Sequence, residues 1–225
     1  MEALAGERRI TYDARGLAEP TADVPKISEI EGARAQFDAK ELSTRQINLE
    51  LRWLLYEQGV KDVTVLNPGA KHSLGVGILM RCHITFAGSL GYFGCGLIDG
   101  PEIRIKGRVG ARTGIDQKGG TVIVLGDAGS MTGFMMQRGR QILCGNVGPG
   151  LGDSMYEGTI YVAGNVKSLG IDCIPGEWTD ADTELIERKF RIYELGAPPS
   201  FQKFVCGKKL YNYDNLEPSE RKLVL

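Results

Sequence analysis

Glycine recurs in this chain at a fixed interval of nineteen positions, and this interval constrains the fold more than any other feature. The first series comprises Gly88, Gly107, Gly126, Gly145 and Gly164. A second series, three positions later, comprises Gly91, Gly110, Gly129 and Gly148. Further glycines, later in each interval, recur at the same spacing. Several series in one register indicate a structural repeat with one unit per interval.

Each repeat opens with a short apolar run just before its first glycine. The five runs read HITFA, EIRIK, TVIVL, RQILC and TIYVA. Alternation that is rich in β-branched residues predicts a strand with one buried face. A unit of this length is too short for two helices, and the Leu/Asn signature of leucine-rich repeats is missing. We therefore predict an all-β core, a right-handed parallel β-helix (solenoid) with one strand per coil.

About six coils are expected, over residues 62–175. The first of them is degenerate: Gly69 lies one interval before Gly88 and follows an apolar run at 63–66. In such a column, equivalent strands stack about 4.8 Å apart and bury their inward side chains together. We expect the glycines to serve the corners, where φ is often positive and backbones approach closely.

Composition excludes several functional classes. Lys+Arg number 27 against 28 Asp+Glu, for a net charge of −1, so the basic surplus of a nucleic-acid or membrane-surface binder is missing. No run approaches the roughly 20 apolar residues of a membrane span, and the first residues lack the apolar core of a secretion signal. The five cysteines form no C-x-x-C and fit reduced thiols. We expect a cytoplasmic protein with neither a nucleic-acid nor a membrane partner.

The region before the repeats predicts an arm and a capping helix. Residues 1–42 are polar and without periodicity, which predicts an extended N-terminal arm. The sequence from Ser43 to Gln46 then matches a capping box. Apolar residues at helical spacing predict a helix over 44–58, within a capping segment at 43–61. We expect its apolar face to cover the open end of the first coil.

The region after the repeats, residues 176–225, predicts a second helix and a tail. The helix is expected over 180–195, with Thr179 or Asp180 as its N-cap. The rest of the chain is aromatic and basic and is expected to be extended. Such a tail packs either on its own domain or on a partner, and the sequence leaves both open.

Few residues offer catalytic chemistry. The glycine clusters at 94–100 and 148–152 do not match G-x-G-x-x-G, and neither sits in a βαβ unit. His72, beside Lys71 in a turn, is either a solvated turn histidine or a functional one, whereas His83 begins a strand and is expected to be structural. We predict no catalytic, cofactor-binding or metal-ligating residue on this chain.

The side chains at the outward strand positions change from polar to apolar along the column. They are polar in the first coils, as at Thr85 and Arg104. Later coils place an apolar patch there, comprising Ile123, Leu125, Ile142 and Tyr161. A patch of this kind is covered by something, here either the chain's own helix at 180–195 or a second protein chain. The four residues are therefore a candidate interface.

The glycine turns resemble the GXGXG domain, the C-terminal β-helix of the glutamate synthase large subunit, which also occurs as a subunit of formylmethanofuran dehydrogenase. Residues 89–100, SLGYFGCGLIDG, are similar to its D-Y-x-G-K-G-L-x-G-G turn, and residues 126–136 to its G-x-x-G-x-x-x-G-x-M coil. Residues 69–77 resemble its first-coil turn. The resemblance covers about residues 45–195. Cys95 stands where the family turn usually has Lys, so no role of that Lys transfers.

The resemblance implies a non-catalytic scaffolding subunit of a split glutamate synthase-type complex. There, separate chains supply a glutamine-amidotransferase-like subunit, the GXGXG domain and an FMN-binding synthase subunit. FMN and an iron–sulfur cluster are expected in a partner subunit and no cofactor on this chain. The nearest type makes N-methylglutamate from glutamate and methylamine. Two alternatives stay open: the GXGXG component of a formylmethanofuran dehydrogenase-like complex, and an independent solenoid binding protein.

Overall fold

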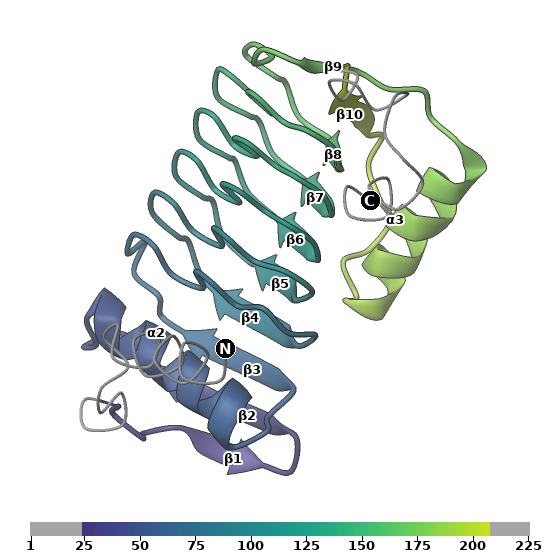
Figure 1. The fold of residues 1–225 in the computed structure, drawn as a ribbon. Helices are drawn as coiled ribbons and strands as arrows, with labels where there is room; N and C mark the ends of the chain where they lie inside the picture. Colours follow the sequence, from purple (N-terminus) through teal and green to yellow (C-terminus); the bar gives the residue numbers. More distant parts are fainter. Residues whose placement is uncertain (1–23, 208–225) are drawn as a thin grey trace, which may run out of the picture.

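The computed structural model describes residues 24–207, and its parallel sheet confirms the predicted β-solenoid (Figure 1). The stacked parallel strands are β2 (Arg34–Asp38), β3 (Asp62–Leu66), β4 (His83–Ala87), β5 (Glu102–Ile105), β6 (Thr121–Val124), β7 (Arg140–Leu143) and β8 (Thr159–Val162). From β4 onward the register advances by one glycine interval per coil, since Ile84 pairs with Ile103 and Ile103 with Val122. The glycine interval therefore predicted the coil length correctly.

The column begins one strand earlier than the sequence predicted. β2 lies in the segment interpreted as an arm, yet it pairs in parallel with β3, and β1 (Glu29–Glu31) pairs antiparallel with β2. The period fails here because a helix is inserted between β2 and β3, so that Arg34 pairs with Asp62, well beyond one interval. The next coil is also longer than the interval, since Asp62 pairs with His83. Residues 1–23 of the expected arm lie outside the described range.

The helix before the repeats forms where it was predicted. α2 (Thr44–Arg52) continues into a π-helical turn, η1 (Trp53–Glu57). Ser43 and Gln46 form the capping box, and the apolar face of the helix is buried in the core. The amide of Asn48 donates to Ser73 O at 2.8 Å and its carbonyl accepts from Gly75 N at 2.9 Å. α2 thus covers the loop of the first coil, while β1 and β2 form the end of the sheet.

The other end of the column is closed by antiparallel strands. The chain runs from β9 (Cys173–Pro175) through α3 (Asp180–Ile192) to β10 (Gln202–Cys206), which lies between β8 and β9. Of the two N-caps that the sequence left open, Thr179 is the one that caps α3. Residues 202–206 of the expected tail therefore pack on the chain's own sheet, and residues 208–225 lie outside the described range. α3 stands against the outer face of the column, opposite the loops (Figure 1).

Inward side chains stack into one continuous apolar core, and only one inward position of the strands β2 to β8 is polar. The aliphatic column formed by the strands is buried throughout. In β7, however, the inward position is Gln141, whose amide donates to Gln117 Oε1 at 3.1 Å. The Oε1 atom of Gln141 is buried and has no hydrogen-bond partner in the described part of the chain. A buried acceptor of this kind costs stability at this level of the core.

Of the two reasons expected for glycine at the corners, only the close approach of backbones applies to the two glycine series. Their φ angles are not positive; instead, the loops stack too closely for a side chain. A Cβ on Gly107 would lie 2.6 Å from Ser89 N, and one on Gly110 would lie 2.7 Å from the carbonyl carbon of Gly91. Positive φ belongs to later glycines, such as Gly114 and Gly133.

Candidate functional site

The apolar patch that the sequence offered as an interface is buried beneath α3. Ile123 and Ile142 are fully buried and Tyr161 is 2% exposed, in a cluster with Ile186 and Phe190 of the helix. Leu125 and Cys144 pack against the same cluster. Of the two alternatives that the sequence left open, the structure shows the first, since the chain's own helix covers this patch and leaves no exposed apolar surface there.

Asp182 fixes the N-terminal end of α3 to the sheet. Its carboxylate accepts hydrogen bonds from Tyr161 OH at 2.6 Å, Lys203 Nζ at 2.8 Å and Thr179 N at 2.7 Å. Burial opposes ionisation of Asp182, but the hydrogen bonds from Lys203, Thr179 and Tyr161 outweigh it and hold the pKa of this carboxyl well below its ordinary value. Burial and the bond to Asp182 raise the pKa of Tyr161. The helix is thus held by an ionised, multiply bonded carboxylate.

Glu102 anchors the C-terminal end of α3. Its two carboxylate oxygens accept from Lys189 Nζ and from Tyr193 OH. The hydroxyl of Tyr193 also lies 3.2 Å from Nδ1 of His83, and Arg104 stacks on the tyrosine ring at 4.5 Å. Burial, followed by the bond to Glu102, raises the pKa of Tyr193. A phenol that is harder to ionise and bonded on both sides positions the helix and is a poor general base.

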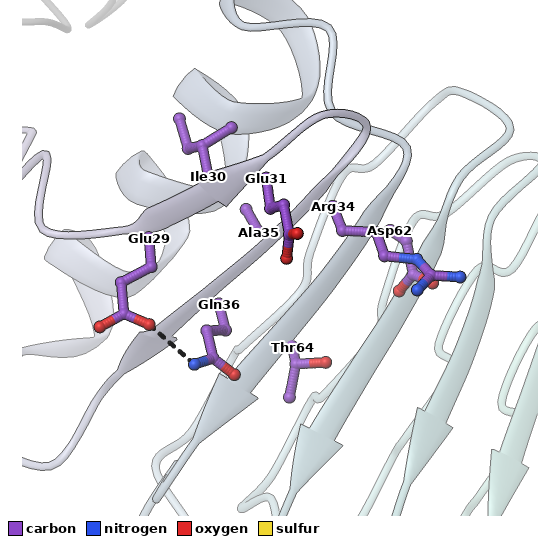
Figure 2. A pocket seen from close by; sticks show the side chains of 8 residues that line it. All are labelled: Glu29, Ile30, Glu31, Arg34, Ala35, Gln36, Asp62 and Thr64. Carbon is purple, nitrogen blue, oxygen red and sulfur yellow. Dashed lines mark hydrogen bonds between the residues drawn. The ribbon is translucent and has the colours of Figure 1, made fainter.

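Beyond α3, the outer face of the sheet is open and forms a polar trough. Two adjoining hollows of about 420 and 430 Å³ share Arg34, Asp62 and Thr64 in their linings. Figure 2 shows the end of this trough at β1, where Gln36 donates to Glu29 Oε2 at 2.8 Å. The trough runs from there across β2, β3 and β4 to Tyr193 at the end of α3.

The trough is lined by both acidic and basic side chains and can therefore bind ligand groups of either charge. Arg34 and Asp62 face each other across paired strands, and Glu102 and Arg104 line the far end. Arg104 donates from Nη2 to Thr85 at 3.2 Å, while its buried Nε has no partner among the described residues. The strand order brings these acidic and basic side chains onto one surface. Such a surface suits hydrogen-bonded recognition.

The turn that contains His72 and Lys71 has a structural role. Nδ1 of His72 accepts from Tyr92 N at 2.9 Å, and the two rings stack 4.7 Å apart. Lys71 Nζ donates to Ala39 O and Lys40 O at 3.1 and 3.2 Å. A Cβ on Gly91 would lie 2.1 Å from His72 Nδ1, so this glycine makes room for the histidine. Both side chains therefore join the first loop to its neighbours.

Opposite the sheet, the stacked loops present an apolar edge. Large exposed side chains on these loops are Leu79, Tyr92, Phe93, Leu97 and Tyr156. The guanidinium of Arg112 lies between the rings of Phe93 and Phe134, at 5.6 and 5.9 Å, so the edge continues across three coils. We call this surface the loop edge. It is an exposed apolar surface of the column that α3 does not cover.

Three of the cysteines are poor candidates for chemistry. Burial raises the pKa of the Cys95 thiol to about 12 and those of Cys82 and Cys144 to about 11, which makes them poor nucleophiles. Within residues 24–207, no group of three or more His, Cys, Asp or Glu comes together as metal ligands would. None of the helices in that range is long and apolar enough to cross a bilayer.

Comparison of the chain with protein-family models, with curated proteins and with solved structures found no match in any of the three.

Sequence reasoning found the covered patch but missed the trough and the Glu102 network. A signal for the trough was present, because Thr85 and Arg104 mark outward polar positions. This signal was incomplete, because β2 and β3 do not follow the nineteen-residue period. Their register adds Arg34 and Asp62 to the same surface. The pairing of Glu102 with Tyr193 joins distant parts of the chain and has no local signal.

Proposed function

We propose that this chain is a non-catalytic scaffolding subunit of a glutamate synthase-type complex. It would brace a glutamine-amidotransferase-like subunit against an FMN- and iron–sulfur-containing synthase subunit, in a complex that makes N-methylglutamate from glutamate and methylamine. The identity of the complex rests on the resemblance of the glycine turns at 89–100 and 126–136 to the GXGXG domain. FMN and the cluster would belong to the partner.

The exposed apolar loop edge is the observation that carries the assembly role. Phe93 and Leu97 are exposed and have φ angles of 60° and 56°, a region that costs a non-glycine residue about 1 kcal/mol or more. Positive φ recurs at the equivalent positions of the next coil, Arg112 and Asp116, so it belongs to the loop geometry, and it is the exposure of the two apolar side chains that favours a role at the surface. An apolar surface spread over several coils is typical of a protein–protein contact.

A continuous column suits a bracing role. Parallel hydrogen bonding joins every strand from β2 to β8, and backbone bonds also join successive loops, as from Phe93 N to Ala111 O at 2.9 Å. Two stacked ladders on opposite sides of one core resist bending between the ends. Partners bound at different coils would therefore keep a fixed separation.

The first test is gentle affinity purification of this chain from its native cells, with an absorption spectrum and mass-spectrometric identification of co-purifying chains. We expect flavin bands, an amidotransferase-like chain and a synthase chain, and methylamine-dependent turnover in the purified complex. A co-purifying molybdopterin chain would point to the formylmethanofuran dehydrogenase-like alternative. A colourless single chain would contradict the proposal.

Variants of the loop edge test its role within that complex. Phe93→Asp combined with Leu97→Asp places two charges in the loop edge, and Asp tolerates positive φ better than most residues. We expect loss of one co-purifying chain with an unchanged circular dichroism spectrum. Lys118→Asp, at an exposed position on the next coil, is the matched control and should retain both chains. Equal retention by both variants would exclude the loop edge as the docking surface.

A further inference from the structure

Two cysteines face each other across the last strand pair. Cys173 of β9 is the direct antiparallel partner of Cys206 of β10. Gly207 N donates to Asp172 O at 2.8 Å, and Gly176 N donates to Lys203 O at 2.8 Å. These bonds flank the cysteine pair and show that it occupies a non-hydrogen-bonded position, where Cα atoms lie about 4.5 Å apart.

That position meets the requirements of a disulfide. A disulfide needs Cα atoms roughly 4.4–6.8 Å apart and side chains on the same face of the strands. Directly opposed residues of an antiparallel pair share a face. Cys173 is 5% exposed and belongs to the main core, and Cys206 packs against that core with its Sγ 3.0 Å from Met155 O. Both side chains therefore point toward the interior at the end of the column.

We propose that Cys173 and Cys206 form a redox modification site, a dithiol that a small-molecule disulfide such as oxidised glutathione converts to a disulfide joining β9 to β10. The Cys206 thiolate, which is partly exposed, attacks the oxidant and releases one thiol. The Cys173 thiolate then attacks Cys206 Sγ and releases the second thiol. The two cysteines are oxidised, the oxidant is reduced to two thiols, and these thiols take up the two protons.

The burial of Cys173 sets the rate of this reaction. Burial, followed by the neighbouring Cys206, raises the pKa of its thiol to about 11. Only a small fraction of Cys173 is therefore thiolate near neutral pH, so ring closure is slow and becomes faster as the pH rises. Exposed surface thiols would react without this delay.

The disulfide would close a loop that carries α3. Residues 173–206 leave the column at β9, cross the outer face as α3 and return as β10. A covalent bond between β9 and β10 would fix both ends of that loop and so hold α3 over Ile123 and Ile142. The remaining cysteines, Cys82, Cys95 and Cys144, lie outside the described strands, so none of them has a cysteine as a strand partner.

The test uses the full chain, incubated at pH 8 with oxidised glutathione or with dithiothreitol. Thiols are counted with Ellman's reagent after denaturation, and unreduced peptides are mapped by mass spectrometry. We expect loss of two of the five thiols, a peptide linked through Cys173 and Cys206, and a rise in Tm of roughly 5 °C, since a closed loop stabilises the fold.

Single serine variants supply the controls. Cys173→Ser and Cys206→Ser should each lose the linked peptide and the rise in Tm, whereas Cys144→Ser should keep both. Retention of all five thiols in the wild-type chain, or a disulfide mapped to another pair, would overturn the proposal. The mapping of the wild-type chain decides the matter even if a serine variant fails to fold.

Discussion

The outer face of the sheet has a covered half and an open half, although both halves use the same positions of the repeat. From β3 to β8, the middle outward position carries Thr64, Thr85, Arg104, Ile123, Ile142 and Tyr161. α3 lies over the last three, and the first three line the trough. The repeat therefore determines the solenoid fold, while the outward side chains determine the part of the sheet on which α3 packs.

The boundary between the halves falls between Arg104 and Ile123. At this boundary α3 ends, and the contacts change from apolar packing to the network around Glu102. A helix that continued over the polar half would bury polar groups without partners, which costs free energy. The charged residues at the end of α3 instead meet polar partners at the edge of the covered half.

The largest expected effect comes from the covered half. Ile142→Ala should lower the free energy of unfolding by about 3 kcal/mol, because it removes a fully buried side chain between the sheet and α3. Thr64→Ala, at the equivalent position in the open half, should cost less than about 1 kcal/mol. Urea denaturation of both variants measures the difference. Equal losses would show that α3 does not stabilise the covered half.

A smaller loss is expected at the carboxylate that holds the start of α3. Asp182→Asn should lower the free energy of unfolding by roughly 2 kcal/mol, because it removes the charge that pairs with Lys203 and weakens the cap at Thr179. Asp180→Asn, at an exposed position in the same turn, is the control and should cost less than about 0.5 kcal/mol. Chemical denaturation of the two variants measures both losses, and a control as unstable as Asp182→Asn would contradict a special role for this carboxylate.

The same carboxylate predicts a pH dependence. The pKa of Asp182 is lower in the folded than in the unfolded chain, so its contribution is present above about pH 4 and is lost as the pH falls toward the folded value. Chemical denaturation at pH 6 and pH 3 should show a larger loss of stability for the wild-type chain than for Asp182→Asn. Identical losses would show that Asp182 does not act through its charge.

The sequence predicted those parts of the fold that depend on local pattern. The glycine period predicted the strands from β4 to β8, and the capping residues Ser43 and Thr179 marked the helix starts. Contacts between distant segments had no such signal, as shown by β2, by the Glu102 network and by the opposed cysteines. Cys95 is a further example, because it occupies the turn position that is glycine at 75, 114, 133 and 152, with a φ of 56°. Only the packing of its thiol inside the core shows why a side chain fits there.

A further prediction tests the network at the boundary. Glu102→Gln should lower the free energy of unfolding by about 1 kcal/mol, because an amide accepts more weakly than a carboxylate from Lys189 and Tyr193. Glu187→Gln, on the exposed side of α3, should change it by less than about 0.5 kcal/mol. Hydrogen exchange should locate the loss in the last turn of α3. Faster exchange along the whole helix would contradict a local role.

The smallest expected effect comes from moving the boundary by one strand. Arg104→Leu extends the row of Ile123 and Ile142 onto β5 and removes the buried Nε that has no partner among the described residues. It also removes the stacking on Tyr193 and the hydrogen bond to Thr85. The two gains should outweigh the two losses, so that the free energy of unfolding rises by roughly 0.5 kcal/mol. Arg104→Lys keeps the charge but loses the planar stack and should be slightly less stable than the wild type. If the leucine variant is the less stable of the two, then the charge of Arg104, rather than the end of the apolar row, determines where α3 stops.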